Sequence, residues 1–193
     1  MARSSLSHPA SERRTPLEER AAAYVQALIR TGAQRQSHAE AHFGSARFQT
    51  LQAEEVLKIV YGTLGALVLP TRLAYQRLGI PGRPVSALTA TEQVALKEAV
   101  TLALTRGYTV ISVGARVVRL EDAQARQHVM QVRVAAGVTP PHTVASLIRQ
   151  YSPSLRAGKG RLILVTLHPE RYVTQAKRQP LLEVWTLTST ARS

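Results

Sequence analysis

The sequence predicts a mixed α and β protein, in which a helical N-terminal region precedes a mixed-sheet α/β domain. Apolar residues recur at helical spacing between residues 15 and 78, and this region could contain a helix-turn-helix whose wing would be the strand pair after the helix at 91–106. The run Gly79–Pro84 is rich in glycine and proline and is typical of a turn or linker. Strand-like apolar runs then alternate with helical segments up to residue 187. We therefore expect a basic arm over residues 1–14, a helical domain over 15–84 and an α/β domain over 85–193.

The N-terminal elements begin with a flexible polar arm, after which Thr15 and Glu18 form a capping box for a helix that ends at Gly32. Residues 34–49 are expected to be helical only in part. Thr50 can cap a further helix that carries apolar residues up to Leu67, and a short helix follows Pro70.

The C-terminal elements begin with a helix over residues 91–106, opened by a second capping box at Thr89–Glu92. A hairpin around Gly114 follows, and then a strand at 129–134. A helix is expected at 143–151, a loop at 152–160, a buried strand at 162–167, a short helix at 170–177 and a last strand at 181–187.

The composition points to a polyanionic partner. The 193 residues include 25 Lys or Arg against 12 acidic residues, which gives a net charge of +13. Nucleic acid, most simply double-stranded DNA, is the first candidate, and an anionic membrane surface is the second. A solubilising surface or a basic proteome would give the same charge without a partner. Self-association stays open.

The same composition excludes several classes of protein. The chain has no cysteine, so disulfides and thiolate metal sites are excluded. Phosphate-binding glycine loops are missing too, so no cofactor is expected. Apolar runs stay shorter than the roughly 18 residues of a membrane span. The N-terminus lacks the apolar core of a secretory signal, so a cytoplasmic location is expected.

Nine basic residues are the candidates for phosphate contacts. A helix-turn-helix within Leu51–Leu78 would bring Arg72 and Arg77 near a DNA backbone, although two ordinary core helices explain the same pattern. The full set of candidates is Arg72, Arg77, Arg83, Arg116, Arg119, Arg133, Arg156, Lys159 and Arg161.

The order of elements from Glu92 to Leu187 resembles the restriction-endonuclease-like core of PD-(D/E)XK nucleases. That resemblance implies an Asp near the second strand and a Glu-x-Lys on the third, which together hold a divalent metal and a water. Here the second strand has no Asp, and the third carries Gln131 and Arg133 at those positions. A hard cation prefers carboxylate oxygens, so the resemblance implies a nuclease-like domain without its metal site.

The chain also resembles plasmid replication-relaxation proteins, which join a winged helix-turn-helix to a nuclease-like region. The similarity rests on the helix at 91–106, the hairpin at 108–120 and the run Ser146–Tyr151. It implies a DNA-binding protein that acts in replication or maintenance of a plasmid, phage or chromosome and is not a catalyst.

Three smaller motifs have simpler explanations. His38 and His42 lie four apart with Glu40 between them, a spacing that metals use but that a solvated helix face also produces. His168, Tyr172 and Lys177 are similar to part of a relaxase site, which needs a second histidine that is missing here. Gly158–Gly160 is too short for a P-loop, although its amides and Lys159 could meet a phosphate.

Two other functions stay open. One is an active metal-dependent nuclease, in which Asp122, the single Asp of the chain, works with Glu92 or Glu98, or in which Glu98, Glu121 and Asp122 converge. The other is a basic subunit that binds RNA or an acidic protein.

Overall fold

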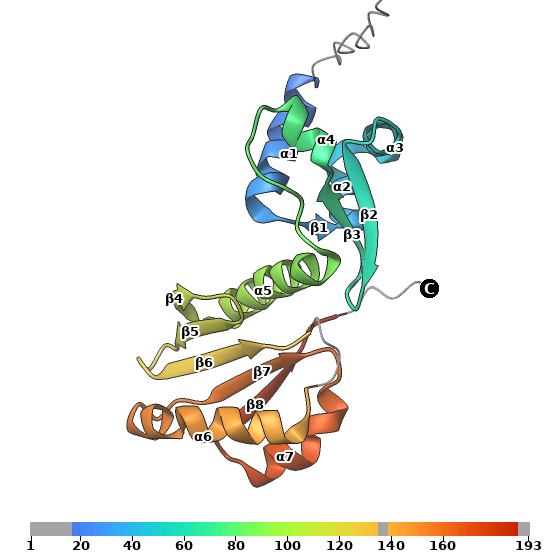
Figure 1. Ribbon diagram of the computed structural model, residues 1–193. Helices are drawn as coiled ribbons and strands as arrows, with labels where there is room; N and C mark the ends of the chain where they lie inside the picture. Colours follow the sequence, from blue (N-terminus) through green and yellow to red (C-terminus); the bar gives the residue numbers. More distant parts are fainter. Residues whose placement is uncertain (1–16, 135–138, 189–193) are drawn as a thin grey trace, which may run out of the picture.

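The computed structural model describes residues 17–134 and 139–188, and it consists of two lobes joined by one long helix, α5 (Figure 1). The N-terminal lobe contains, in chain order, α1 (Glu19–Thr31), β1 (Gln34–Arg35), α2 (Gln36–Phe43), α3 (Ser45–Ala53), β2 (Leu57–Gly62), β3 (Gly65–Pro70) and α4 (Arg72–Arg77). The connecting helix α5 spans Ala87–Thr105. The C-terminal lobe contains β4 (Thr109–Val113), β5 (Val117–Glu121), β6 (Gln127–Val132), α6 (Pro141–Ala157), β7 (Leu162–Thr166), η1 (Pro169–Tyr172), α7 (Val173–Arg178) and β8 (Leu182–Thr186). The predicted mixed α and β class is confirmed.

The N-terminal lobe packs its helices on a small antiparallel sheet with the order β1-β3-β2. Val25 and Leu28 of α1, Phe48 and Leu51 of α3, and Val68 of β3 form its core. Because α1 and α3 bury only one side each, the opposite side of each helix is left to solvent.

The helix expected from Thr50 to Leu67 is wrong. Thr50 lies inside α3, and residues 57–70 form the β2–β3 hairpin, which turns at Gly65 with φ of 91°. Val68 packs into the N-terminal core, whereas Leu67 and Leu69 on the other face pack toward α5. A strand buried on both faces gives a continuous apolar run, and such a run does not distinguish a strand from a buried helix.

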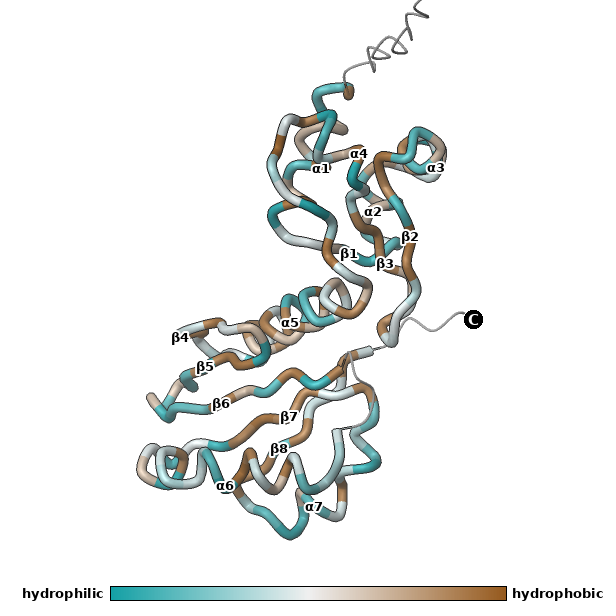
Figure 2. Tube along the Cα trace, viewed as in Figure 1, coloured by the Kyte–Doolittle hydropathy of each residue, from teal (hydrophilic) through white to brown (hydrophobic). Residues whose placement is uncertain are grey.

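The C-terminal lobe is a five-stranded sheet with the order β4-β5-β6-β7-β8. The first three strands pair antiparallel and the last two pairings are parallel. One face, with Met130 and Ile163, packs on α5, whereas the other, with Val129 and Leu164, packs on α6. Figure 2 shows β7 in hydrophobic colours along most of its length, and all five of its residues are buried. The predicted order of elements in this half is confirmed.

Two element boundaries in this half differ from the prediction. The hydroxyl of Ser86, and not that of Thr89, caps α5, since it accepts the Thr89 N–H at 3.1 Å. The loop expected at 152–160 is wrong over most of its length, because α6 continues through Pro153 to Ala157. Leu155 is buried in the core below α6, and this burial offsets the cost of a proline inside a helix. Thr15 and the basic arm lie outside the described residues.

The two lobes share one hydrophobic cluster. Ala33, Leu64 and Leu67 of the N-terminal lobe pack with α5, and α5 packs with Met130 and Ile163 of the large sheet. The domain boundary predicted at 79–84 falls between α4 and α5 and stays a prediction. In the described part of the chain, no helix combines the length and apolarity needed to cross a bilayer.

A buried ion pair ties the lobes together at this junction. The Arg35 guanidinium on β1 makes a two-pronged contact with the Glu98 carboxylate on α5, with 2.6 Å between Nη2 and Oε2. Arg35 also donates to the carbonyl of Leu64 at 2.8 Å and to that of Thr188 at 2.8 Å. Arg35 is 6% exposed. One side chain therefore joins β1, the hairpin tip, α5 and the segment after β8.

We expect Arg35→Met to lower the free energy of unfolding by about 3–5 kcal/mol, because it leaves the Glu98 carboxylate and two carbonyls without their donor. Arg35→Met with Glu98→Met should lose much less, since no buried charge is left unpaired. Urea unfolding followed by circular dichroism measures both.

The matched control is Arg47→Met, which removes an arginine from the more exposed ion pair with Glu18. Its cost should stay below about 1 kcal/mol. An Arg35→Met protein no less stable than Arg47→Met would contradict this account of the junction.

Candidate nucleic-acid interface

The first candidate surface is built on the α2–α3 corner. A single residue, Gly44, separates the two helices, and it adopts a φ of 77° that favours glycine. Its N–H donates to the Glu40 carbonyl at 2.7 Å, which closes α2. Phe48 and Leu51 anchor α3 in the core, so the opposite side of α3 is held outward in a fixed orientation.

That outward side of α3 is neutral and has hydrogen-bonding groups. We call it the α3 face; it consists of the exposed residues Ser45, Ala46, Gln49, Thr50 and Ala53. The Gln49 amide has no hydrogen-bond partner among the described residues, and the Thr50 hydroxyl donates to the Ala46 carbonyl at 3.1 Å. A Gln amide can read an adenine edge, and Ala or Thr methyl groups can contact a thymine methyl. The α3 face therefore has the side chains that base reading needs.

Basic side chains lie beside one end of this face. The Thr71 hydroxyl and N–H bond the carbonyls of Glu55 and Val56, which holds the start of α4 against the end of α3. Arg72 is exposed in the first turn of α4, and Lys58 is exposed at the start of β2. Exposed basic side chains of this kind can contact phosphates.

The other N-terminal candidates are placed differently. Arg77 is mostly buried, and its Nη1 contacts Glu54 at 2.9 Å, so its charge is balanced within the lobe. Arg83 is exposed in the connection to α5. The helix-turn-helix predicted within Leu51–Leu78 does not form there, because this stretch contains the end of α3, the β2–β3 hairpin and α4. The sequence patterns did not single out the α3 face.

The second candidate surface lies at one end of the C-terminal lobe. The α6–β7 loop rests on the start of β6, so closely that a Cβ on Gly160 would meet the Gln127 carbonyl oxygen at 1.7 Å. This contact brings two basic segments together. We call the result the C-lobe basic cluster; it consists of Arg126, Arg156, Lys159 and Arg161, all exposed.

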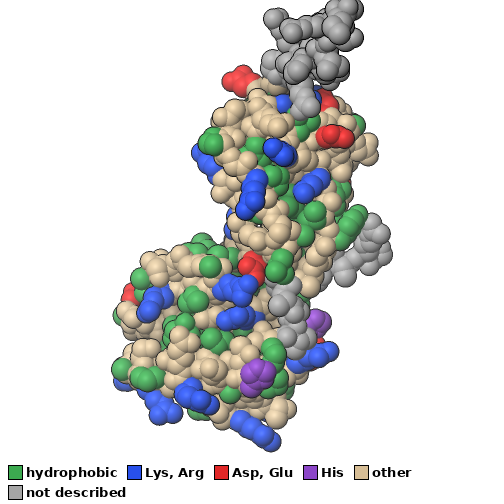
Figure 3. All heavy atoms as spheres, viewed as in Figure 1, with side chains coloured by type: hydrophobic (Ala, Val, Ile, Leu, Met, Phe, Trp, Pro, Cys, Tyr) green, Lys and Arg blue, Asp and Glu red, His purple; other side chains and the backbone are tan. Residues whose placement is uncertain are grey.

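The side chains of this cluster differ in whether they have hydrogen-bond or ion-pair partners within the protein. Arg156 and Lys159 have no side-chain partner among the described residues. The Arg161 Nη1 lies 3.4 Å from Glu183, an exposed and weak contact. Figure 3 shows Lys and Arg side chains spread over both lobes with few acidic ones on the face in view. The cluster suits backbone phosphates, which are contacted without regard to sequence.

The amides of Gly158–Gly160 are not available to a phosphate, which corrects the expectation for this loop. The N–H groups of Gly158, Lys159 and Gly160 donate to Ser154, Arg156 and Leu155, where they close the end of α6. Only the Lys159 side chain remains for an anion.

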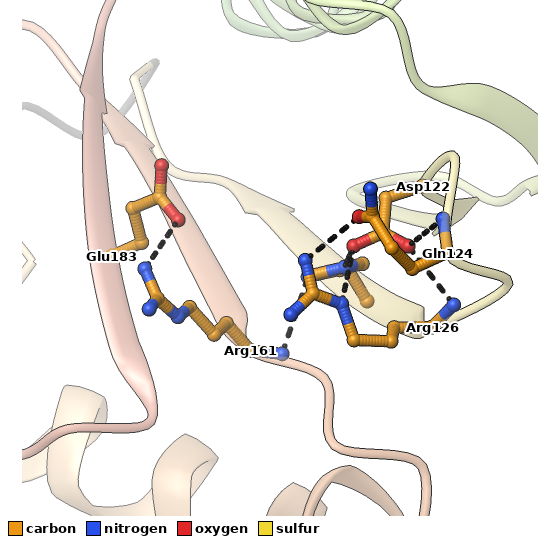
Figure 4. A network of polar contacts seen from close by, with 6 residues as sticks. Asp122, Gln124, Arg126, Arg161 and Glu183 are labelled. Atoms are coloured by element: carbon orange, nitrogen blue, oxygen red, sulfur yellow. Dashed lines mark hydrogen bonds and ion pairs between the residues drawn. The ribbon is translucent and has the colours of Figure 1, made fainter.

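Asp122 organises the turn that carries Arg126 (Figure 4). Its Oδ1 accepts the N–H groups of Gln124 and Arg126 at 2.9 and 3.0 Å, and its Oδ2 accepts the Arg126 Nε at 2.7 Å. The His128 Nδ1 accepts the Arg161 N–H at 3.2 Å, so its Nε2 donates to Asp122 at 3.0 Å. Burial alone would raise the pKa of Asp122, but these hydrogen bonds outweigh it and hold the pKa well below its usual range.

The carboxylates proposed for a nuclease site are held in separate places. Glu98 pairs with Arg35 at the lobe junction, Glu92 pairs with Arg116, and Asp122 is engaged by Arg126 and His128. Glu121 lies on β5 opposite Thr109. Among residues 17–134 and 139–188, no three acidic or histidine side chains gather as a metal site would require.

Most side chains of the two histidine-containing motifs make contacts within the protein. The His42 ring stacks on Tyr24 with 5.0 Å between centroids, whereas His38 is exposed. Tyr172 is 1% exposed and donates to the Thr139 carbonyl at 2.8 Å, so it is a core residue. The nearest carboxylate to His168 is that of Glu170, at 3.3 Å.

Gln131 and Arg133, which the nuclease resemblance places at the metal-binding positions of the third strand, lie in different surroundings. The Gln131 amide is buried and donates to the Tyr151 hydroxyl of α6 at 3.2 Å. Arg133 follows the end of β6 and lines a cavity with Arg116 and Glu92. Arg119 is exposed on β5.

Comparison of the chain with models of known protein families, with curated proteins and with solved structures finds no match.

We expect Asp122→Asn to be less stable than the unchanged protein at pH 7, with a gap that narrows as the pH falls. A depressed folded-state pKa stabilises the fold fully above the unfolded value of about 3.9, and this stabilisation is lost as the pH falls toward the folded value. Urea unfolding between pH 7 and pH 3 measures the gap.

Glu170→Gln serves as the control, because its carboxylate is 65% exposed and, among the described residues, its one ion pair is with His168. It should show little difference at any pH. A gap for Asp122→Asn that stays constant down to pH 3 would count against the role assigned to the ionised carboxylate.

Proposed function

We propose that the protein binds double-stranded DNA, with α3 entering the major groove and the C-lobe basic cluster contacting backbone phosphates. The observation that carries the proposal is the α3 face, an outward helix side with Gln49 and Thr50, flanked by Lys58 and Arg72. The net charge of +13 supports a polyanionic partner.

The proposal identifies residues 19–70 as a winged helix-turn-helix. Support comes from the order helix, short strand, two helices and hairpin, and from the sheet order β1-β3-β2. In such a unit the second helix of the corner is the reading helix, and here that helix is α3.

In this proposal the β2–β3 hairpin does not enter a groove of the DNA. The Thr63 hydroxyl donates to the Val134 carbonyl at 3.1 Å, and Leu64 is fully buried in the cluster around α5. A hairpin tip held in this way is not free to enter a groove. Base contacts are therefore assigned to α3 alone, and the hairpin serves to fix α3 relative to the rest of the protein.

The resemblance to plasmid replication-relaxation proteins extends the proposal to a role in replication or maintenance of a plasmid, phage or chromosome. The strand and helix order from α5 to β8 supports a nuclease-like core, with Gln131 and Arg133 at the metal-binding positions of the third strand. The protein would then use this domain to bind DNA and not to cut it.

We expect tight duplex binding at low salt, with a log–log slope of about −0.9 for each phosphate contacted. The triple variant Arg156→Ala, Lys159→Ala, Arg161→Ala should bind more weakly and lower the slope by about two to three contacts. Fluorescence anisotropy of a labelled duplex between 50 and 300 mM salt, about the range where counterion release dominates, measures both.

A matched control removes the same charge from η1 and α7, in the triple variant Arg171→Ala, Lys177→Ala, Arg178→Ala. It should keep most of the slope. Equal losses in the two triple variants would reject the cluster as the contact surface, and stronger binding to RNA than to duplex DNA would favour a different partner.

The α3 face should control sequence preference. After selection of preferred duplexes from a random pool, Gln49→Ala should lose about 1–3 kcal/mol of discrimination at one base pair while its salt slope is unchanged. Gln150→Ala, an exposed glutamine on α6, is the control. Identical site preferences in Gln49→Ala and the unchanged protein would exclude α3 as the reading helix.

We expect no cleavage of supercoiled or linear DNA with magnesium or manganese. Metal-assisted cleavage needs carboxylates that converge on one cation, and Glu98 and Asp122 are engaged in separate ion pairs. Incubation over a range of metal concentrations, beside Asp122→Ala, tests this. Cleavage that needs metal and disappears in the variant would overturn the non-catalytic proposal.

A further inference from the structure

A cavity of about 170 Å³ lies where α5, the end of β6 and the start of α6 meet. Ala95, Val132 and Val134 form its apolar walls, and Thr139 and Thr143 add two hydroxyl groups. Its charged side chains are Glu92 from α5, Arg116 from the β4–β5 turn and Arg133 after β6. The charges of these three residues sum to +1, so the cavity favours an anion.

Arg133 has a buried donor that a ligand in the cavity could satisfy. Its backbone N–H donates to the Val165 carbonyl at 2.9 Å, which fixes the chain between β6 and β7. Its guanidinium Nε is buried, and no acceptor for it exists among the described residues. A buried N–H of a charged group without an acceptor is costly, and an oxyanion in the cavity would remove that cost.

Arg116 stands at the more open side of the same cavity. Its Nη2 contacts the Glu92 carboxylate, while the side chain is 46% exposed. This contact uses part of a guanidinium that has five N–H donors, so others remain for a second acceptor. Glu92 therefore holds Arg116 at the cavity, but its negative charge also opposes an incoming anion.

The start of α6 adds to the positive electrostatic potential in the cavity. This helix of 17 residues begins at Pro141, and its N-cap residue, Pro140, has no side chain that can cap it. Its positive end lies at Thr139, Pro140 and Thr143, which line the cavity. Two arginines, a helix start and a neutral apolar wall therefore converge on one cavity.

We propose that this cavity binds a phosphate group. A phosphate presents oxygens in several directions, so it can accept from Arg133 and Arg116 at once, whereas a flat carboxylate presents both oxygens on one side. The same chemistry is offered by inorganic phosphate, by a mononucleotide and by the 5′-phosphorylated end of a DNA strand. Binding of a free phosphate needs no duplex. This site can therefore be tested independently of the α3 face and the C-lobe basic cluster.

The test is isothermal titration calorimetry with three probes: inorganic phosphate, a nucleoside monophosphate, and a short single-stranded oligonucleotide with or without a 5′-phosphate. We expect binding of at least one phosphorylated probe, and no cavity binding of the unphosphorylated oligonucleotide. The probe that binds most tightly identifies the source of the phosphate.

Variants assign the binding to the cavity. Arg133→Met should weaken it by about tenfold or more, as expected for loss of a charge-assisted hydrogen bond. Glu92→Gln should strengthen it severalfold, because it removes the one negative charge and frees Arg116. Arg149→Met, an exposed arginine on the outer side of α6, is the control of equal charge and should change little.

Glu92→Gln keeps the proposal falsifiable even if Arg133→Met folds poorly, since a gain in affinity cannot come from misfolding. Absence of binding by every phosphorylated probe would overturn the proposal. So would phosphate binding that Arg133→Met leaves intact, or that Glu92→Gln weakens. Duplex anisotropy on the same variants tells failure of the cavity apart from failure of duplex binding.

Discussion

The arrangement of the whole molecule depends on the buried contact between Arg35 and Glu98. A guanidinium that is 6% exposed is stable in a protein interior only when every strong donor finds an acceptor. Arg35 on β1 meets this requirement with acceptors from three other parts of the chain, namely the Leu64 carbonyl of the hairpin tip, Glu98 of α5 and the Thr188 carbonyl after β8. None of these parts can move away without leaving a buried charge or carbonyl unpaired, so the ion pair specifies one relative placement of the lobes.

Helix α5 makes that placement possible, because it is packed on two sides. Small residues at Ala90, Ala95, Ala99 and Ala103 let β3 and the large sheet approach it closely. Lys97 adds a hydrogen bond of 3.1 Å to the Ala33 carbonyl, and burial lowers the pKa of this lysine. The α3 face and the cavity between α5, β6 and α6 are therefore held in one fixed arrangement. A nucleic acid held by one lobe would meet the other in a fixed geometry.

The sequence was more informative about the C-terminal lobe than about the N-terminal lobe, for physical reasons. From α5 to β8 each element is bounded by glycine, proline or polar residues, so the order of elements could be predicted, although the helix expected at 143–151 continues to Ala157. The β2–β3 hairpin was missed because Leu67, Val68 and Leu69 are buried on both faces of β3 and hide the alternation of a strand. An excess of basic side chains on the surface could be predicted from the net charge. The convergence of Arg116 and Arg133 on one cavity could not, because it arises from the pairing of β5 and β6 and the docking of α5.

The central claim is that the two lobes form one cooperative unit through the Arg35 junction. Native-state hydrogen exchange in low urea tests it most directly, because it reports the opening free energy of each element. The account predicts that the amides of β3 in the N-terminal lobe and those of β7 in the C-terminal lobe exchange with the same free energy and the same urea dependence. Exchange of β3 at a clearly lower free energy, while β7 stays protected, would show that the N-terminal lobe opens by itself and would contradict the account.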